Sequence, residues 1–149
     1  MAAGEVKVRF FEDLEVGQAA ERTITVGEAD IQAFAAVSGD TNPVHLDQAY
    51  AETTPFKGRI AHGMLAGAYI SALLGTELPG PGAIYLSQSL TFKRAVRPGD
   101  ALLVKVEVKA LDDKTGTAVL ATSCSVGRKQ MVAGEAEVLV PRRPAAEAA

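Results

Sequence analysis

Along the last third of the chain, apolar and polar residues alternate as they do in half-buried β-strands. Val104, Val106 and Val108, for example, alternate with charged residues. This pattern predicts four strands, at residues 83–93, 101–111, 117–128 and 130–140. Short connections, among them a hairpin loop at residues 112–116, favour antiparallel pairing, and a fifth strand is predicted earlier, at residues 20–26.

In the middle of the chain, apolar residues recur with helical spacing instead. The pattern predicts helices at residues 28–37, 47–52 and 63–74. Thr25 and Glu28 are expected to form a capping box at the start of the first helix, and Gly39 is expected to end it in the left-handed conformation. Asp47 is expected to cap the second helix, after a non-helical polar loop at residues 40–46.

The helix predicted at residues 63–74 is apolar on nearly every side, which is typical of a helix buried in a core. One buried helix beside about five antiparallel strands indicates an α+β fold in which a curved sheet wraps the helix. Residues 6–141 are expected to form a single domain. The ends, residues 1–5 and 142–149, are rich in alanine and charge and are expected to be flexible.

Composition narrows the classes of function. The 149 residues are 48% hydrophobic and 22% charged, as in a globular domain, and a formal charge of -3 argues against nucleic acid as a partner. No signal peptide is evident and the longest apolar stretch, residues 60–74, is too short to span a membrane, so no membrane association and a cytoplasmic location are expected. The single cysteine, Cys124, excludes an intrachain disulfide and is expected to be a small buried residue.

The residues best suited to chemistry lie on the predicted polar loop: Asp40, Asn42 and His45. A carboxylate and an imidazole on one loop can share a water molecule, one group accepting a proton while the other donates one. The competing interpretation is structural, with Asp40 capping local amides and His45 satisfied inside the fold. A metal site made of Asp40, His45 and His62 is a further alternative, but their spacing matches no established ligand motif, so no metal is expected.

A second candidate element, His62-Gly63-Met64, begins the long predicted helix. The N–H groups at a helix start lack intrahelical acceptors, and Gly63 has no side chain to keep a substrate oxygen away. Its N–H is therefore a candidate oxyanion donor. Close packing of the helix would explain the same glycine. Ser71, in the same helix, would either line a pocket or bond back to a carbonyl one turn earlier.

Three runs of sequence are similar to one family. The run "FAAVSGDTNPVHLD" at residues 34–47 closely resembles the hydratase-2 motif of the MaoC-like family. The runs "RIAHGMLAGAYISALLG" at residues 59–75 and "IYLSQSLTFKRAVRPGD" at residues 84–100 also resemble that family. The resemblance covers roughly residues 11–140 and is best to the single-domain (R)-specific enoyl-CoA hydratases that supply polyhydroxyalkanoate synthesis.

This resemblance implies a hot-dog fold, in which a five-stranded antiparallel sheet wraps a long central helix, and a homodimer with a sheet continuous across its interface. It implies that Asp40 and His45 are the catalytic pair and that the Gly63 N–H binds the thioester carbonyl. The remaining residues expected around the substrate are Asn42, Ser71, His62, Met64 and Phe56. The implied reaction is the reversible (R)-specific hydration of trans-2-enoyl-CoA of short to medium chain length, with coenzyme A as part of the substrate and no further cofactor.

Other functions stay open at this stage. They are a dehydratase acting on acyl-carrier-protein or on branched or carboxylated acyl-CoA substrates, a hot-dog thioesterase, and a non-catalytic acyl-CoA-binding subunit. The run from Asp40 to His45 argues against the thioesterase. Cations that could meet the phosphates of coenzyme A are Lys57, Arg59, Lys93 and Arg94, although surface exposure would explain them equally well, and Arg59 is assigned no specific role.

Overall fold

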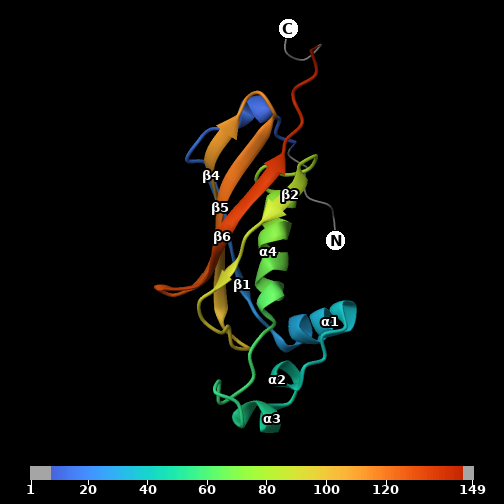
Figure 1. The fold of residues 1–149 in the computed structure, drawn as a ribbon, viewed down its shortest axis with the longest axis vertical. Coiled ribbons are helices and arrows are strands. Elements are labelled where there is room, and N and C mark those ends of the chain that lie inside the picture. The colour runs from blue at the N-terminus through green and yellow to red at the C-terminus, as the bar shows by residue number, and fades with distance from the viewer. Residues whose placement is uncertain (1–7, 146–149) are drawn as a thin grey trace.

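A computed structural model describes residues 8–145, in which an antiparallel sheet curves around one long helix (Figure 1). The strands are β1 (Ala19–Thr25), β2 (Ile84–Gln88), β3 (Thr91–Phe92), β4 (Ala101–Asp112), β5 (Thr117–Val126) and β6 (Lys129–Leu139). The helices are η1 (Phe11–Asp13), α1 (Glu28–Ser38), α2 (Pro43–Leu46), α3 (Gln48–Glu52) and α4 (Gly63–Thr76). This arrangement confirms the predicted α+β class.

The sheet has the order β1-β4-β5-β6-β2, and β3 also pairs with β6. The strand predicted at residues 83–93 is therefore divided into β2 and β3, which both pair antiparallel with β6. The division lies where Ser89, between β2 and β3, packs against Gly134 of β6. Only a glycine allows this contact, since a Cβ at position 134 would be 1.7 Å from the Ser89 carbonyl oxygen. The sheet is thus five strands wide, as predicted, but it has six strands, because β2 and β3 follow one another along the same side of β6.

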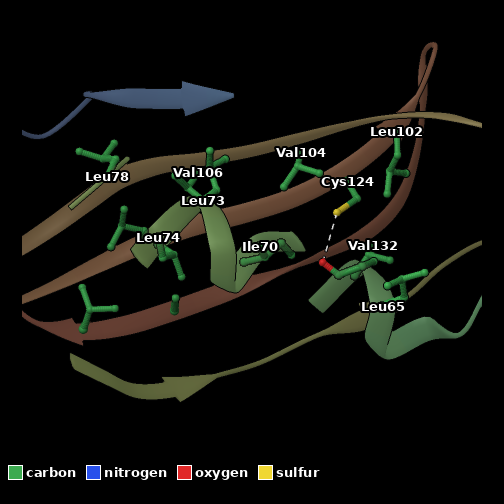
Figure 2. Packing of buried hydrophobic residues seen from close by; sticks show 14 of the residues in the cluster. Leu65, Ile70, Leu73, Leu74, Leu78, Leu102, Val104, Val106, Cys124 and Val132 are labelled. Carbon is green, nitrogen blue, oxygen red and sulfur yellow. Dashed lines mark hydrogen bonds between the residues drawn. The ribbon is translucent and has the colours of Figure 1, made fainter. Parts of the chain in front are cut away.

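The core lies between α4 and the inner face of the sheet (Figure 2). The alternation in β4 is confirmed, because Val104, Val106 and Val108 are fully buried. Ile70 of α4 packs into the same cluster. Cys124 is also fully buried, with its Sγ 3.9 Å from the Ala66 carbonyl oxygen, and burial raises the pKa of its thiol to about 12. It is the small core residue that the sequence predicts.

The start of α1 differs from the prediction. Gly27 is the N-cap residue, and its N–H donates to the Asp30 carboxylate at 2.9 Å. Thr25 does not cap the helix because it is still paired with Ala101 in the sheet, and the Glu28 carboxylate is bound by Arg59. The predicted end is correct, since Gly39 has a φ of 77° in the left-handed region.

The prediction of a non-helical loop at residues 40–46 is wrong in part, because this segment contains one helical turn, α2. The Asn42 side chain accepts the Val44 N–H at 3.1 Å, and Pro43 occupies the first helical position. Proline disfavours a helix before it but is well suited to begin one, because its fixed φ is helical and its missing N–H needs no partner there. Asp47 caps α3 as predicted, accepting the Tyr50 N–H at 3.2 Å.

Helix α4 is not buried on every side. Leu65, Ile70 and Leu73 face the core, whereas Ala68 and Ser71 belong to an exposed face. The prediction of a helix buried all round is therefore wrong, because in the described part of the chain the sheet covers only the opposite side of α4 (Figure 1). Among the described residues, no helix is long and apolar enough to cross a membrane.

The predicted domain limits and flexible ends lie partly outside the described residues, since residues 1–7 and 146–149 are not described. Within the predicted C-terminal tail, the Arg142 guanidinium lies over the Phe11 ring, 4.7 Å from its centre. The Arg143 N–H donates to the Glu12 carboxylate at 3.1 Å. These two residues thus contact η1, near the beginning of the described chain.

Candidate active site

The Asp40 side chain is oriented by the turn that follows α1. Its own N–H donates to the Ser38 hydroxyl at 3.1 Å, and its Oδ1 accepts the Asn42 N–H at 3.2 Å. The other carboxylate oxygen, Oδ2, lies 3.9 Å from Nε2 of His45, and about half of the Asp40 side chain is exposed. One oxygen of Asp40 thus holds the loop, while the other faces His45.

His45 is buried in α2, and one of its ring nitrogens contacts a backbone carbonyl. Its Nδ1 lies 2.8 Å from the Ile60 carbonyl oxygen. A carbonyl only accepts, so Nδ1 carries the proton, and in the neutral ring the lone pair is on Nε2. The 3.9 Å between Nε2 and the Asp40 Oδ2 is too long for a direct hydrogen bond. It is short enough for one water molecule to bond both atoms.

Arg59 holds the backbone of His45 in place. Its Nε donates to the His45 carbonyl at 2.7 Å, and its two terminal nitrogens donate to the Glu28 carboxylate at 2.9 and 2.8 Å. The Arg59 guanidinium is the main reason that the pKa of Glu28 lies below its usual value. Sequence reasoning missed this residue, because Arg59 and Glu28 are 31 positions apart and no local pattern joins them.

Gly63 is the first residue of α4, and among the described residues its N–H has no hydrogen-bond acceptor. A Cβ at this position would lie 2.9 Å from the Phe92 ring, so only glycine fits without a shift of that ring. Gly63, His45 and His62 line the same cavity, of about 320 Å³. Other residues around it are Phe56, Tyr69, Lys93, Arg94, Leu102 and Val132.

Asp40, His45 and His62 offer one potential metal-ligand atom each within 4.8 Å of one another. The His45 and His62 rings, however, are stacked with their centres 3.9 Å apart and their planes at 29°. Each nitrogen lone pair lies in the plane of its ring, and the planes of these two stacked rings lie one above the other, whereas a metal about 2.0–2.1 Å from each nitrogen requires the lone pairs to converge on one point. The residues present therefore do not fit a chelating site.

The remaining predicted site residues are spread over two cavities. Met64 and Ser71 line a second cavity, of about 410 Å³, between α4 and β2. Phe56 lies at the first cavity and is 42% exposed. The Asn42 side chain, expected around the substrate, accepts the Val44 N–H and so caps α2 between Asp40 and His45. The structure thus brings Asp40, His45, His62 and Gly63 together, whereas Met64 and Ser71 line the second cavity along α4.

The candidate phosphate-binding cations differ in their surroundings. Arg59 is engaged inside the site, as described above. The Lys93 ammonium donates to the Gln130 side chain at 2.7 Å. Arg97 also points inward and donates to the Phe56 and Gly58 carbonyls, at 2.5 and 3.1 Å. Lys93 and Arg94 are the exposed cations that line the first cavity.

Residues 11–129 match the model of the MaoC like domain. This chain belongs to the MaoC-like family. It is 49% identical over 143 residues to the (R)-specific enoyl-CoA hydratase of Rhodospirillum rubrum, and the match covers 96% of this chain and 99% of that protein.

Solved structures agree with this assignment. The unliganded R-hydratase PhaJ1 from Pseudomonas aeruginosa is 54% identical, with a TM-score of 0.85 and coverage of 90% of this chain and 86% of that one. The (R)-hydratase from A. caviae involved in PHA biosynthesis is 48% identical, with a TM-score of 0.84 and coverage of 87% and 99%. The fold is accordingly the hot-dog fold that the resemblance implied.

Proposed function

We propose that this protein catalyses the reversible (R)-specific hydration of trans-2-enoyl-CoA to (R)-3-hydroxyacyl-CoA. The observation that carries the proposal is the gap between Asp40 and His45, in which the two facing atoms are 3.9 Å apart beside a cavity that the Gly63 N–H also reaches. The near full-length similarity to (R)-specific enoyl-CoA hydratases supports the same reaction.

The arrangement of the pair suits the activation of water. When Asp40 is ionised and His45 is neutral with its proton on Nδ1, the two facing atoms are both acceptors. A water between them gives both its hydrogens to the pair and directs a lone pair away from it, toward C3 of the substrate. Asp40 takes one proton as the oxygen attacks, and the pair returns a proton to C2 from the same side. Atoms balance without any cofactor, and the addition is syn.

Gly63 supplies the second part of the mechanism. As water adds, negative charge grows on the thioester oxygen, and a donor already in place stabilises that charge more than it stabilises the substrate. The Gly63 N–H is free for this purpose, since it has no acceptor among the described residues. Its place at the N-terminus of α4 adds the favourable end of the helix dipole.

We assign the coenzyme A portion of the substrate to the first cavity and its acyl chain to the second. The coenzyme A portion would approach past Phe56, Lys93 and Arg94, where cations suit its phosphates. The acyl chain would follow α4 toward Ser71 and Met64. No cofactor besides the coenzyme A of the substrate is part of the proposal. A cytoplasmic location is part of it, and a lone, buried Cys124 is compatible with a reducing compartment.

A homodimer also belongs to the proposal. Within residues 8–145, strand β2 pairs with β6 on one side only, so its other edge is open there. Ile84, Tyr85 and Leu86 on β2 are 56%, 40% and 50% exposed. The substitution Ile84→Lys is expected to shift the molecular mass by light scattering from dimer to monomer. Val16→Lys, at a position 64% exposed away from this edge, is the matched control. A dimeric Ile84→Lys variant would contradict the interface.

The direct test is the loss of the conjugated absorbance of crotonyl-CoA on hydration. Asp40→Asn and His45→Gln are each expected to keep the melting temperature and to lower kcat by about 10²–10⁴-fold. Near-wild-type turnover in either variant would contradict the assignment of the pair. Stereospecific 3-hydroxyacyl-CoA dehydrogenases report handedness, and an (S)-product would contradict the proposal. Release of free thiol would instead indicate a thioesterase, and preference for an acyl-carrier-protein substrate would indicate the related dehydratase.

A further inference from the structure

His62 occupies a buried position directly before α4, between the groups that the proposed reaction uses. Only 3% of its surface is exposed. Its Nε2 lies 2.9 Å from the Asp40 carbonyl oxygen. Because that oxygen can only accept, Nε2 carries the proton, and in the neutral ring Nδ1 carries the lone pair.

Two aromatic rings pack against His62. The His45 ring is stacked on it, with centres 3.9 Å apart. The Phe34 ring of α1 lies near it, with centres 4.9 Å apart and planes at 58°. His62 therefore supports the face of the catalytic imidazole while its Nε2 holds the backbone of the catalytic carboxylate.

The second ring nitrogen of His62 shows that packing alone does not explain the residue. Nδ1 is buried and has no hydrogen-bond partner among the described residues. A buried acceptor without a donor costs stability, and an apolar ring of similar size would fill the space without that cost. The feature of histidine that phenylalanine lacks, and that the structure uses, is the N–H donated to Asp40.

We propose that His62 is a positioning residue that sets the Asp40 carboxylate, the His45 imidazole and the Gly63 N–H relative to one another. It is joined to the first by a hydrogen bond, to the second by ring stacking, and to the third by a peptide bond. This inference rests on the proposed function. Because His62 acts through the pair rather than through the coenzyme A contacts, its loss lowers kcat and leaves KM nearly unchanged.

Two substitutions separate its contributions. His62→Gln keeps an N–H donor in the place of Nε2 but removes the ring, and His62→Phe keeps a ring against His45 but removes the donor. We expect His62→Phe to lose about 10–100-fold in kcat for crotonyl-CoA and His62→Gln to recover most of that loss, as for other residues that orient a functional group by a hydrogen bond. KM is expected to stay within about threefold in both.

The matched control is Thr76→Val, which also removes one hydrogen bond from a side chain to a backbone carbonyl, the 2.7 Å bond to Ala72, but at the opposite end of α4 from Gly63. It should keep wild-type kcat. Melting temperatures are measured for all three variants, and ¹⁵N spectra of the histidine rings should show the His62 proton on Nε2 in the wild type.

Several results would overturn the role. They are wild-type kcat in His62→Phe, equal losses in His62→Phe and His62→Gln, losses that merely follow melting temperature in all variants, or a His62 proton on Nδ1. In each of these cases an active wild type leaves the proposed function intact. A wild type that hydrates no enoyl thioester overturns the proposed function and this role with it.

Discussion

Gly134 of β6 is the position where the smallest substitution should have the largest effect. In Gly134→Ala the new Cβ would lie 1.7 Å from the Ser89 carbonyl oxygen and 2.6 Å from its carbon. Ordinary contact begins at about 3.4 Å, so the backbone between β2 and β3 has to move by more than an ångström. No side-chain rotation can relieve this contact, because both atoms belong to the main chain.

The cost follows from the contacts that the shift breaks. The Ser89 N–H donates to the Glu135 carbonyl at 2.9 Å, and the Glu135 N–H donates to the Ser89 hydroxyl at 3.0 Å. Each bond contributes about 1 kcal/mol, and the remaining overpacking costs about 1–3 kcal/mol. The expected loss is about 3–5 kcal/mol, or a fall of roughly 6–20 °C in melting temperature for a chain of this size.

Calorimetry and urea unfolding measure this loss. Gly27→Ala is the matched control, since its Cβ would meet the Asp30 carboxylate at 3.5 Å, an ordinary distance, and the expected change is about 1 kcal/mol or less. Equal melting temperatures for Gly134→Ala and Gly27→Ala would refute the reasoning. That result would mean that β2 and β3 are free to move away from β6 at little cost.

Three further predictions concern the site and the core. Cys124 is buried and its thiol pKa is raised to about 12, so it should resist maleimide at pH 8 until the protein unfolds. Its contribution to stability should be lost as the pH rises above about 9, the ordinary thiol pKa, because the unfolded state then releases a proton that the folded state keeps. Rapid labelling of the native protein would show that the packing is wrong. Arg59→Lys keeps the charge but loses the planar set of N–H donors, so the hydrogen bond to the His45 carbonyl weakens and kcat should fall about tenfold. Unchanged kinetics would mean that this bond does not position Asp40 and His45. Gly63→Ala should reduce kcat/KM at least about tenfold, because its Cβ needs the place of the Phe92 ring, and a crystal structure of an active variant with an undisturbed ring would contradict this.

Local patterns were sufficient for most of the fold. Alternation alone predicts β4, β5 and β6, because one face of each strand is buried and the other is not. The C-terminal end of α1 and the start of α3 follow from Gly39 and Asp47, residues whose own chemistry ends or caps a helix. Asp40 and His45 were also accessible from sequence, since they lie on one short segment and need only a turn of helix to face each other.

Other features depend on which distant segments meet. Arg59 binds the His45 carbonyl and the Glu28 carboxylate, and His62 donates to the Asp40 carbonyl. These bonds join residues 14 to 31 positions apart, and such contacts leave no periodic signal in the sequence. The exposed face of α4 is equally invisible, because an apolar residue has the same sequence signature whether its own sheet or another surface covers it. The sequence by itself determined most of the strands and helices, the end of α1, the cap of α3 and the proposed pair of Asp40 and His45. Only the tertiary structure decided how the pair is held and that β2 and β3 divide at Gly134, because these depend on distances between backbones that no local pattern records.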